Sequence, residues 1–358
     1  MRNRGRVVRA AAAVIAALLM LVQPAEAAEK SSVERATVAC AGDLMCLGTQ
    51  IYNARTKNGI DFDYVFSGVK KLLGSADITV GNLETPVAGK KAGYAKRGQP
   101  KPPVLNAPYS FLTAVKNAGF DMVATSNNHA LDKGENGLLA TVKNIRKAGL
   151  IETGCFTSKQ ARRYAIKTVN GIRIGLLSYN DIGYNEKNSA ISASKQEWML
   201  NTYGVEKAKR DIAALRKKGR ADVIIVYMHW GVENVNTVSA EQESAAKQLA
   251  DAGADVIIGA HPHALQRAGY IKSVSGKQVI VAYSLGNFTS SMPRVINHDS
   301  VILRLYIKKH VGTISIKADY VPVRTGSRYK LLPPSAINTA DKARIRSAMG
   351  EVFAMALK

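Results

Sequence analysis

Hydrophobic and polar residues follow two periods along this chain. Short runs rich in valine and isoleucine predict β-strands, and apolar residues spaced three or four apart between them predict amphipathic helices. The expected strands cover residues 36–41, 77–80, 121–125, 150–153, 165–169, 172–179, 222–228, 256–258, 269–274, 278–284, 301–308 and 313–321. The expected helices cover residues 61–73, 109–118, 135–148, 205–218 and 240–252. Helices alternate with strands at first and give way to hairpins later, which predicts a layered α/β sandwich of mixed sheets.

Polar and turn-forming residues mark the connections between these elements. Asn170-Gly171 lies between two apolar runs and is a strong β-hairpin signal, because both residues accept the positive φ that such turns need. The chain from 86 to 108 is rich in proline and basic residues, among them Lys96 and Arg97. We predict that this loop forms a lid that binds substrate, with an ordinary solvated insertion as the alternative.

Two further segments are polar. Residues 181–199 predict a loop, and residues 333–358 predict a linker followed by a short helix. The strands and helices between them show no internal repeat. We therefore expect a single large α/β domain over residues 28–332, with the C-terminal segment outside it.

The first 27 residues have the features of a secretory signal peptide. Four arginines precede an uncharged apolar run of 13 residues, and Ala25-Glu26-Ala27 supplies small residues for cleavage. We expect an exported mature chain, in the periplasm, at the cell surface or outside the cell, that begins near Ala28. An uncleaved membrane anchor is the alternative, although the apolar run is short for a bilayer span.

The chain is strongly basic. Its net charge is +23, and loss of four arginines and one glutamate with the signal peptide leaves +20. We expect its partners to be polyanions, either an anionic polymer or a phosphate-bearing substrate. Nucleic acid is not expected, because the protein is exported and carries no recognition motif. A source whose exported proteins are all basic would explain the charge without any such partner.

Three cysteines are too few for a disulfide framework, because at least one must stay unpaired. They are Cys40, Cys46 and Cys155. Cys40 lies in an expected strand, where we predict a small buried hydrophobic side chain. Whether two of the three form a disulfide is left open by the sequence.

Two histidines follow the strand expected at residues 256–258. His261 and His263 are one residue apart, and alternate residues on extended backbone point to the same side, so both rings can reach one centre. Imidazole is a common metal ligand, and the carboxyl ends of strands form the ligand-binding edge of an open α/β sheet. Two ordinary histidines, buried or exposed, are the alternative for this short motif by itself.

Other expected strands end in similar groups. These are Asp43, Asn82 or Glu84, Asn128-His129 and His229. Four of the six histidines lie at such ends, and we expect the other two, His298 and His310, to be ordinary surface residues. A carboxylate, an amide and several imidazoles at one edge form the mixed donor set of a hydrolytic metal site. We therefore predict a site for a divalent metal. This donor set suits Mn, Fe or Zn.

The motifs at these strand ends resemble those of a known family. They are Gly42-Asp43, Asn82-Leu83-Glu84-Thr85, Asn127-Asn128-His129-Ala130-Leu131-Asp132-x-Gly134, His229-Trp230-Gly231-x-Glu233, Gly259-Ala260-His261-Pro262-His263 and Ser284-Leu285-Gly286-Asn287-Phe288. Together they look like the CapA-type capsule biosynthesis family, which is associated with poly-γ-glutamate synthesis and is similar to the calcineurin-like metallophosphoesterases. The resemblance covers residues 36–287 and implies a four-layer α/β/β/α sandwich with two metals between the sheets.

The same resemblance implies roles for individual ligands. Asp43 and His263 would bind a first metal. Asn128, His229 and His261 would bind a second metal.

The resemblance also implies roles beside the metals. His129 would stay off the metals as a general acid or an electrostatic stabiliser. Asp132 would orient the ring of His129, or it would cap a helix instead. Trp230 and Glu233 would form a pocket wall and a substrate contact, or they would serve only the structure.

Two positions depart from the phosphoesterase pattern. Those enzymes have a histidine two residues after the first aspartate, where this chain has Met45, and a bridging aspartate where this chain has Asn82. Losing an anionic bridge leaves two cations less well neutralised at close range. Glu84 is placed to replace that carboxylate, or it serves as a substrate or structural residue. The sequence therefore leaves open whether the site holds one ion or two.

Three functions are compatible with these features. The first is an exported CapA-like protein with a hydrolase or transferase site. It would help to assemble, release or anchor an anionic capsule polymer, with a membrane-bound capsule synthesis complex as its partner. The second is a secreted metallophosphoesterase acting on small phosphate esters. The third is a polyanion-binding protein without catalysis. The unligated His129 beside Asn128 favours catalysis, because a binding module does not need it.

Overall fold

The computed structural model describes residues 33–99, 102–185 and 191–357, so the expected signal peptide lies outside the described chain. Its larger β-sheet is built from strands at both ends of the sequence. The strands are β1 (Glu34–Leu44), β4 (Ile78–Leu83), β5 (Met122–Ala124), β6 (Ile151–Thr153), β13 (Asn287–Thr289), β14 (Asp299–His310), β15 (Thr313–Thr325), β16 (Leu331–Leu332) and β17 (Ala354–Met355). Their order is β16-β15-β14-β1-β4-β5-β6, with β13 against β1 and β17 against β15. β1 runs parallel to β4 and antiparallel to β14, so the sheet is mixed.

The smaller sheet comes from the middle of the chain. Its strands are β7 (Ala165–Val169), β8 (Ile172–Asn180), β9 (Val223–His229), β10 (Val256–Ala260), β11 (Leu265–Lys272) and β12 (Gln278–Leu285), in the order β11-β12-β10-β9-β8-β7. β10 is parallel to both of its neighbours, whereas β11 and β7 are antiparallel to theirs. The predicted turn between β7 and β8 is confirmed, with φ of 48° at Asn170 and 79° at Gly171.

The inner faces of the two sheets form one hydrophobic layer. Successive side chains of a strand point to opposite faces. Val38 and Cys40 of β1 therefore pack with Ile225 of β9 and Ile258 of β10, while Ala39 joins the core on the other side of the larger sheet. The two sheets consequently lie face to face.

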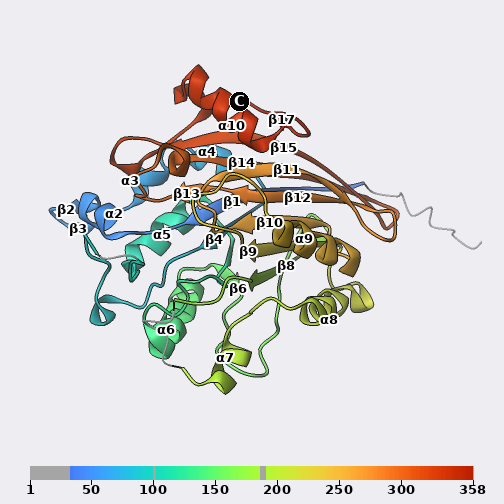
Figure 1. Cartoon of the computed structure of the whole chain (residues 1–358), viewed down its shortest axis with the longest axis horizontal. Coiled ribbons are helices and arrows are strands. Elements are labelled where there is room, and N and C mark those ends of the chain that lie inside the picture. Colours follow the sequence, from blue (N-terminus) through green and yellow to red (C-terminus); the bar gives the residue numbers. More distant parts are fainter. Residues whose placement is uncertain (1–32, 100–101, 186–190, 358) are drawn as a thin grey trace, which may run out of the picture. The chain divides into compact units, whose positions relative to one another are not determined.

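Helices cover the two outer faces (Figure 1). α3 (Asp63–Phe66) and α5 (Tyr109–Ala118) pack on the larger sheet through side chains such as Phe66 and Phe111. α8 (Val205–Arg216) and α9 (Ala240–Ala252) pack on the smaller sheet through side chains such as Ile212 and Leu249. These layers confirm the predicted four-layer α/β/β/α sandwich of mixed sheets.

The remaining elements connect or flank these layers. They are α2 (Gly48–Asn53), the hairpin β2 (Arg55–Thr56) and β3 (Gly59–Ile60), α4 (Lys70–Leu73), α6 (Gly134–Lys147), α7 (Ala193–Met199), α10 (Thr339–Met349) and 3-10 turns of three or four residues such as η1 (Lys90–Ala92) and η4 (Val295–His298). α10 packs against β11 and β14, and β17 adds to the larger sheet. The C-terminal segment thus packs on the sandwich.

Three predicted elements differ from the structure. The helix expected over residues 61–73 is two short helices, α3 and α4, although Phe62, Val65 and Leu73 are all buried as its period predicts. The interruption falls near Gly68, where a Cβ atom would lie 2.2 Å from the carbonyl oxygen of Leu331. The helix is therefore interrupted where the backbone packs closely against Leu331. The loop expected over residues 181–199 contains α7, and β11 lies a few residues before the strand expected at 269–274.

Each of the three cysteines is a buried free thiol, so the structure contains no disulfide between them. Burial raises the pKa of Cys40 and of Cys155 to about 12. Within the described residues, no helix is both long enough and apolar enough to cross a bilayer.

Candidate metal centre

The carboxyl ends of strands from both sheets meet at one buried cluster. Asp43 lies at the end of β1 opposite Asn82 of β4, and His229 ends β9 opposite Ala260 of β10. Glu84 follows β4, and His261 and His263 follow β10. Most of these side chains are almost completely inaccessible to solvent: Asp43, Glu84, His229 and His263 are each at most 1% exposed, and His261 is 6% exposed.

Asp43 is held from several sides. Its Oδ1 accepts a hydrogen bond from Asn82 Nδ2 at 2.8 Å, and its Oδ2 accepts one from the backbone N–H of His261 at 3.2 Å. The Nδ1 atom of His263 lies 3.2 Å from the same Oδ2 atom and 2.9 Å from Asn287 Oδ1. With Nδ1 engaged by two oxygens, Nε2 is the nitrogen of His263 that remains for a ligand.

Glu84 supplies a second carboxylate at the centre of the cluster. Its Oε1 lies 3.5 Å from His229 Nε2 and 3.7 Å from His263 Nε2. This Oε1 atom is buried and has no hydrogen-bond partner among the described residues. The Nδ1 atom of His261 is also buried without a partner. Two unsatisfied buried ligand atoms in one cluster are costly unless another group binds them.

Asn82 and Asn128 present different atoms to the cluster. The Nδ2 of Asn82 faces it, donating to Asp43 and lying 3.4 Å from Glu84 Oε2. An N–H donor does not bind a cation, so in this orientation Asn82 is a positioning residue and not the predicted ligand. Asn128 places its Oδ1, an acceptor, 3.0 Å from His229 Nε2.

The electrostatics of the cluster favour a cation. Burial, together with the charge of Asp43, raises the pKa of Glu84 well above its ordinary value. Burial and the neighbouring imidazoles lower the pKa of His229 well below its ordinary value and that of His261 to about 2. Both imidazoles are therefore neutral at physiological pH, which is the form that binds metals. A bound divalent cation would favour the ionised form of Glu84.

The residues that are present therefore fit a divalent metal. Three overlapping groups offer ligand atoms that lie within 4.8 Å of one another: Asp43, Glu84 and His263; Glu84, His229 and His261; and Glu233, His261 and His263. Glu84 belongs to the first two groups, so its carboxylate is available to both. The mixture of carboxylate and imidazole donors suits transition metals, and it does not identify the ion.

The two histidines after β10 lie in the cluster, but their backbone conformation differs from the prediction. The backbone is not extended there, because φ is 92° at His261 and 54° at His263. Non-glycine residues adopt such conformations at a cost of order 1–3 kcal/mol each, and such costs often occur at functional sites. The two rings nevertheless lie close, with centroids 5.6 Å apart.

His129 lies beside the cluster and is fixed by an acidic partner. Its Nδ1 is 2.6 Å from Asp132 Oδ2, and the same Oδ2 accepts the backbone N–H of Leu105 at 2.6 Å. Asn185 adds contacts to both members, 3.2 Å from His129 Nδ1 and 3.4 Å from Asp132 Oδ1. Asp132 therefore joins His129 to the basic loop that carries Leu105.

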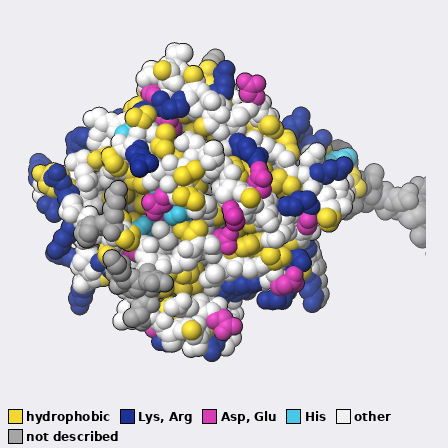
Figure 2. All heavy atoms as spheres, viewed as in Figure 1, with side chains coloured by type: hydrophobic (Ala, Val, Ile, Leu, Met, Phe, Trp, Pro, Cys, Tyr) yellow, Lys and Arg dark blue, Asp and Glu magenta, His cyan; other side chains and the backbone are white. Residues whose placement is uncertain are grey.

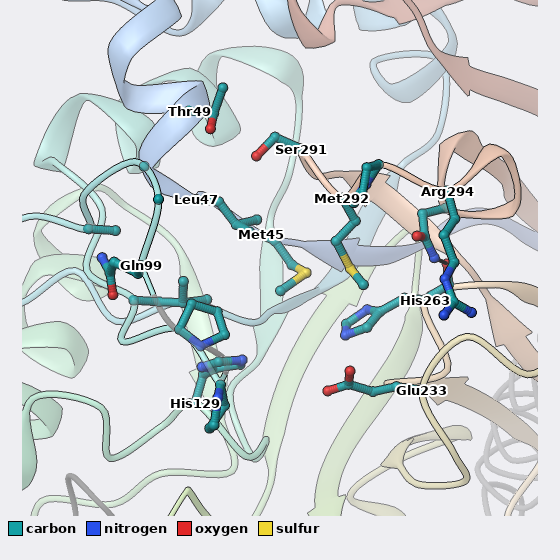
Figure 3. Close-up of a pocket in the computed structure, with 18 of the residues that line it drawn as sticks. Met45, Leu47, Thr49, Gln99, His129, Glu233, His263, Ser291, Met292 and Arg294 are labelled. Atoms are coloured by element: carbon teal, nitrogen blue, oxygen red, sulfur yellow. Dashed lines mark hydrogen bonds between the residues drawn. The ribbon is translucent and has the colours of Figure 1, made fainter.

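A cavity of about 370 Å³ opens above the cluster, and His129, Glu233 and His263 line it (Figure 3). Histidine and acidic side chains adjoin one another on the face shown in Figure 2. Lys96 lines the cavity, and with it Gln99, Pro102, Pro103 and Leu105 of the same basic loop. The loop predicted as a lid therefore forms one wall of this cavity.

Two residues predicted to contact substrate lie elsewhere. Trp230 is 1% exposed, donates its indole N–H to the Tyr283 carbonyl at 2.9 Å and stacks on the Tyr283 ring, so it belongs to the core under α9. A Cβ atom at Gly259 would lie 1.8 Å from the backbone carbonyl oxygen of Tyr283 and 2.4 Å from the Trp230 ring nitrogen, which explains the glycine there. Arg97 stacks over the Tyr52 ring at 4.4 Å and is not among the cavity-lining residues.

Several residues of the site have no role assigned from sequence. Asn287 bonds His263, and its position after β12 follows the same strand-end rule as the other ligands. Asn185 bonds His129 from a polar loop that gives no signal of its own. Met45 and Met292 line the cavity next to His263 (Figure 3).

Comparison with known proteins places this chain in a class of capsule-related proteins. Residues 37–292 match the family model described as bacterial capsule synthesis protein PGA_cap. The chain belongs to this family.

Relatives extend the match over most of the chain. The capsule biosynthesis protein CapA of Bacillus anthracis is 32% identical over 320 residues, covering 87% of this chain and 72% of the relative. The PGA biosynthesis protein CapA of Bacillus subtilis is 29% identical, covering 75% and 67%. A probable polyglutamine synthesis accessory protein of Mycobacterium tuberculosis is 26% identical, covering 74% and 70%.

Among solved structures, the sulfate thiohydrolase SoxB of Thermus thermophilus is similar at a TM-score of 0.43 and 11% identity. The match covers 87% of this chain and 60% of that one.

Proposed function

We propose that this chain is a metal-dependent hydrolase or transferase that acts on an anionic capsule polymer, such as poly-γ-glutamate, during its assembly, release or anchoring. Membership of the capsule synthesis family and the names of the relatives support the polymer. The net charge of +23 supports a polyanionic partner.

One observation carries the catalytic part of this proposal. Glu84 Oε1 and His261 Nδ1 are buried without partners inside a cluster of ligand-type side chains. A protein that only bound a polymer at its surface would gain nothing from burying such groups unsatisfied. Asp43, Glu84, His229, His261 and His263 would hold one ion or two, with Asn128 and Glu233 as further oxygen donors. A bound divalent metal would polarise a carbonyl or phosphoryl oxygen and generate a nucleophile from water.

His129 would act as the general acid of the reaction. Its Nδ1 is occupied by Asp132, so Nε2 is the nitrogen available to the cavity that the ring lines. In hydrolysis of an amide, the water oxygen forms a bond to the acyl carbon, the C–N bond breaks, and the leaving nitrogen needs a proton. Nε2 of His129 is placed to supply it from the doubly protonated ring, in which Nδ1–H donates to Asp132, and the neutral ring that remains would regain a proton from the attacking water.

The place where the chain works is a further part of this proposal. We propose that it is exported by the N-terminal signal and acts beside a membrane-bound polymer synthesis complex, since capsule polymers lie outside the cell. N-terminal sequencing of secreted protein should give a first residue at or near Ala28. Recovery of an intact N-terminus in the membrane fraction would favour the anchor instead.

A direct assay tests the catalytic proposal. Metal-loaded protein should shorten poly-γ-glutamate or transfer its ends. This activity should stop when the metal is chelated and resume when metal is restored. A generic phosphodiester serves as the comparison substrate. Turnover of the phosphodiester alone would indicate a metallophosphoesterase, and polymer binding without any turnover would indicate a binding protein; either result would contradict the proposal.

A further inference from the structure

Two cations at the cavity have no partner among the residues that the structure describes. Lys96 lies on the wall formed by the basic loop, and Arg294 lies on the loop after β13. Neither side chain makes a hydrogen bond or ion pair with any described residue. Other arginines of the sandwich are committed to carboxylates: Arg173 pairs with Asp222 at 2.8 Å and Arg304 with Asp319 at 2.7 Å. Lys96 and Arg294 are therefore free to bind a ligand.

The backbone that carries Arg294 is fixed to the metal-ligand loop. Asn297 is 1% exposed, and its Nδ2 donates to the backbone carbonyl of His263 and to Asn234 Oδ1, each at 2.9 Å. The backbone N–H of Asn297 in turn donates to the carbonyl of Arg294 at 2.9 Å. The backbone of Arg294 is consequently held at a defined distance from the backbone of His263, which places the base of this side chain beside the cluster.

The position of Arg294 decides what it can recognise. Figure 3 shows it next to His263, on the opposite side of the cavity from His129 and Gln99. A guanidinium presents a planar set of donors that matches a carboxylate in two-point contact, and it keeps its charge at any relevant pH. Although Glu233 lines the same cavity, it forms no ion pair with Arg294.

We propose that Arg294, assisted by Lys96 across the cavity, binds a carboxylate of the substrate next to the bond that reacts, so that the site selects anionic acyl chains over neutral ones. Arg294 would thus be a specificity residue. This inference rests on the proposed function for the reaction, but the binding it describes can be measured without turnover.

Fluorescence anisotropy of a labelled γ-linked glutamate oligomer tests this with the full metal-loaded protein. R294E should weaken binding about 10- to 100-fold, the loss expected for a charge-assisted contact, and R294K should recover part of it. K96E should have a smaller effect. R210E is the matched control, because Arg210 is exposed on α8, outside the cavity, and the change in net charge is the same. Thermal melting of each variant verifies folding.

The outcomes separate this inference from the proposed function. Equal loss of affinity in R294E and R210E would overturn it, as would wild-type affinity for an oligomer whose carboxylates are methyl esters. Binding that depends on Arg294 in a protein without turnover would support the inference and contradict the catalytic proposal. Equal turnover of esterified and free oligomers would contradict the inference and support catalysis.

Discussion

The cavity has a floor, formed by the buried cluster of Asp43, Glu84 and the histidines, and a rim that carries Lys96 and Arg294. The two are built in different ways. On the floor, ligand-type side chains are buried and bonded to one another, as Asp43 is to Asn82 and His263. On the rim, Lys96 and Arg294 are exposed and have no ion-pair partner in the described part of the chain. Buried polar groups are costly to leave unsatisfied, whereas exposed cations cost little. The floor therefore has little freedom to change without losing its function, and the rim can vary to select substrates.

The largest effect should follow loss of a ligand from the floor. We expect His261→Ala to lose bound metal and to reduce turnover to background, since it removes an imidazole shared by two of the ligand groups. Metal analysis and turnover should be measured on the same sample. Retention of full metal content would show that His261 is not a ligand and would break the distinction between floor and rim.

His129 should behave differently from His261. His129→Ala should keep its metal but lose about 10²–10⁴-fold in turnover, the usual contribution of a general acid or base. The same metal and activity measurements apply. If His129→Ala and His261→Ala lost metal equally, His129 would be a ligand and its assigned role in proton transfer would be wrong.

A smaller loss is expected from Asp132→Asn. This change keeps the shape but removes the charge that holds His129 Nδ1, so turnover should fall about 10- to 100-fold with metal retained. A loss of folding stability without a loss of turnover would leave Asp132 a purely structural contact to Leu105.

The floor should also make the metal-free protein sensitive to acid. The pKa of His261 is lowered to about 2 by burial and neighbouring histidines, so between about pH 6.5 and that value the unfolded chain binds a proton that the folded chain does not. The free energy of unfolding therefore falls as pH falls, by about 1.4 kcal/mol per pH unit for this one group. Urea unfolding should show a shallower dependence in His261→Ala; an unchanged slope would contradict this account.

The smallest effect is expected at Arg97, which follows Lys96 in the basic loop but does not line the cavity. Arg97→Gln removes only a stacking contact with Tyr52, so it should cost at most about 0.5–1 kcal/mol in stability and leave turnover and polymer affinity unchanged. Thermal melting and the anisotropy assay provide the check. A strong loss of affinity would extend the binding surface beyond the cavity.

The same comparison explains what could be predicted from sequence. Ligands on the floor follow strand ends, and strand ends are visible in the alternation of apolar and polar residues, so Asp43, His229 and the histidines after β10 could be found. The layered α/β class could be predicted from the order of elements for the same reason.

The rest depends on contacts between distant segments. Nothing local to Asn82 shows that its N–H faces the cluster, since that orientation is set by Asp43 on another strand. The burial of Trp230 depends on Tyr283, and the break between α3 and α4 depends on a close approach to Leu331. Arg294 carries no motif, and its role becomes apparent only when its loop is seen beside His263.

Metal content tests the central claim most directly. Full-length protein purified without added metal should contain at least about one equivalent of a transition metal by elemental analysis, and Glu84→Gln, which keeps the shape of the side chain, should contain far less because Glu84 is shared by two ligand groups. Glu197→Gln, the same change on the exposed surface of α7, is a control for the handling of the protein. A metal-free wild type that also fails to bind Mn, Fe or Zn when these are added would contradict the account.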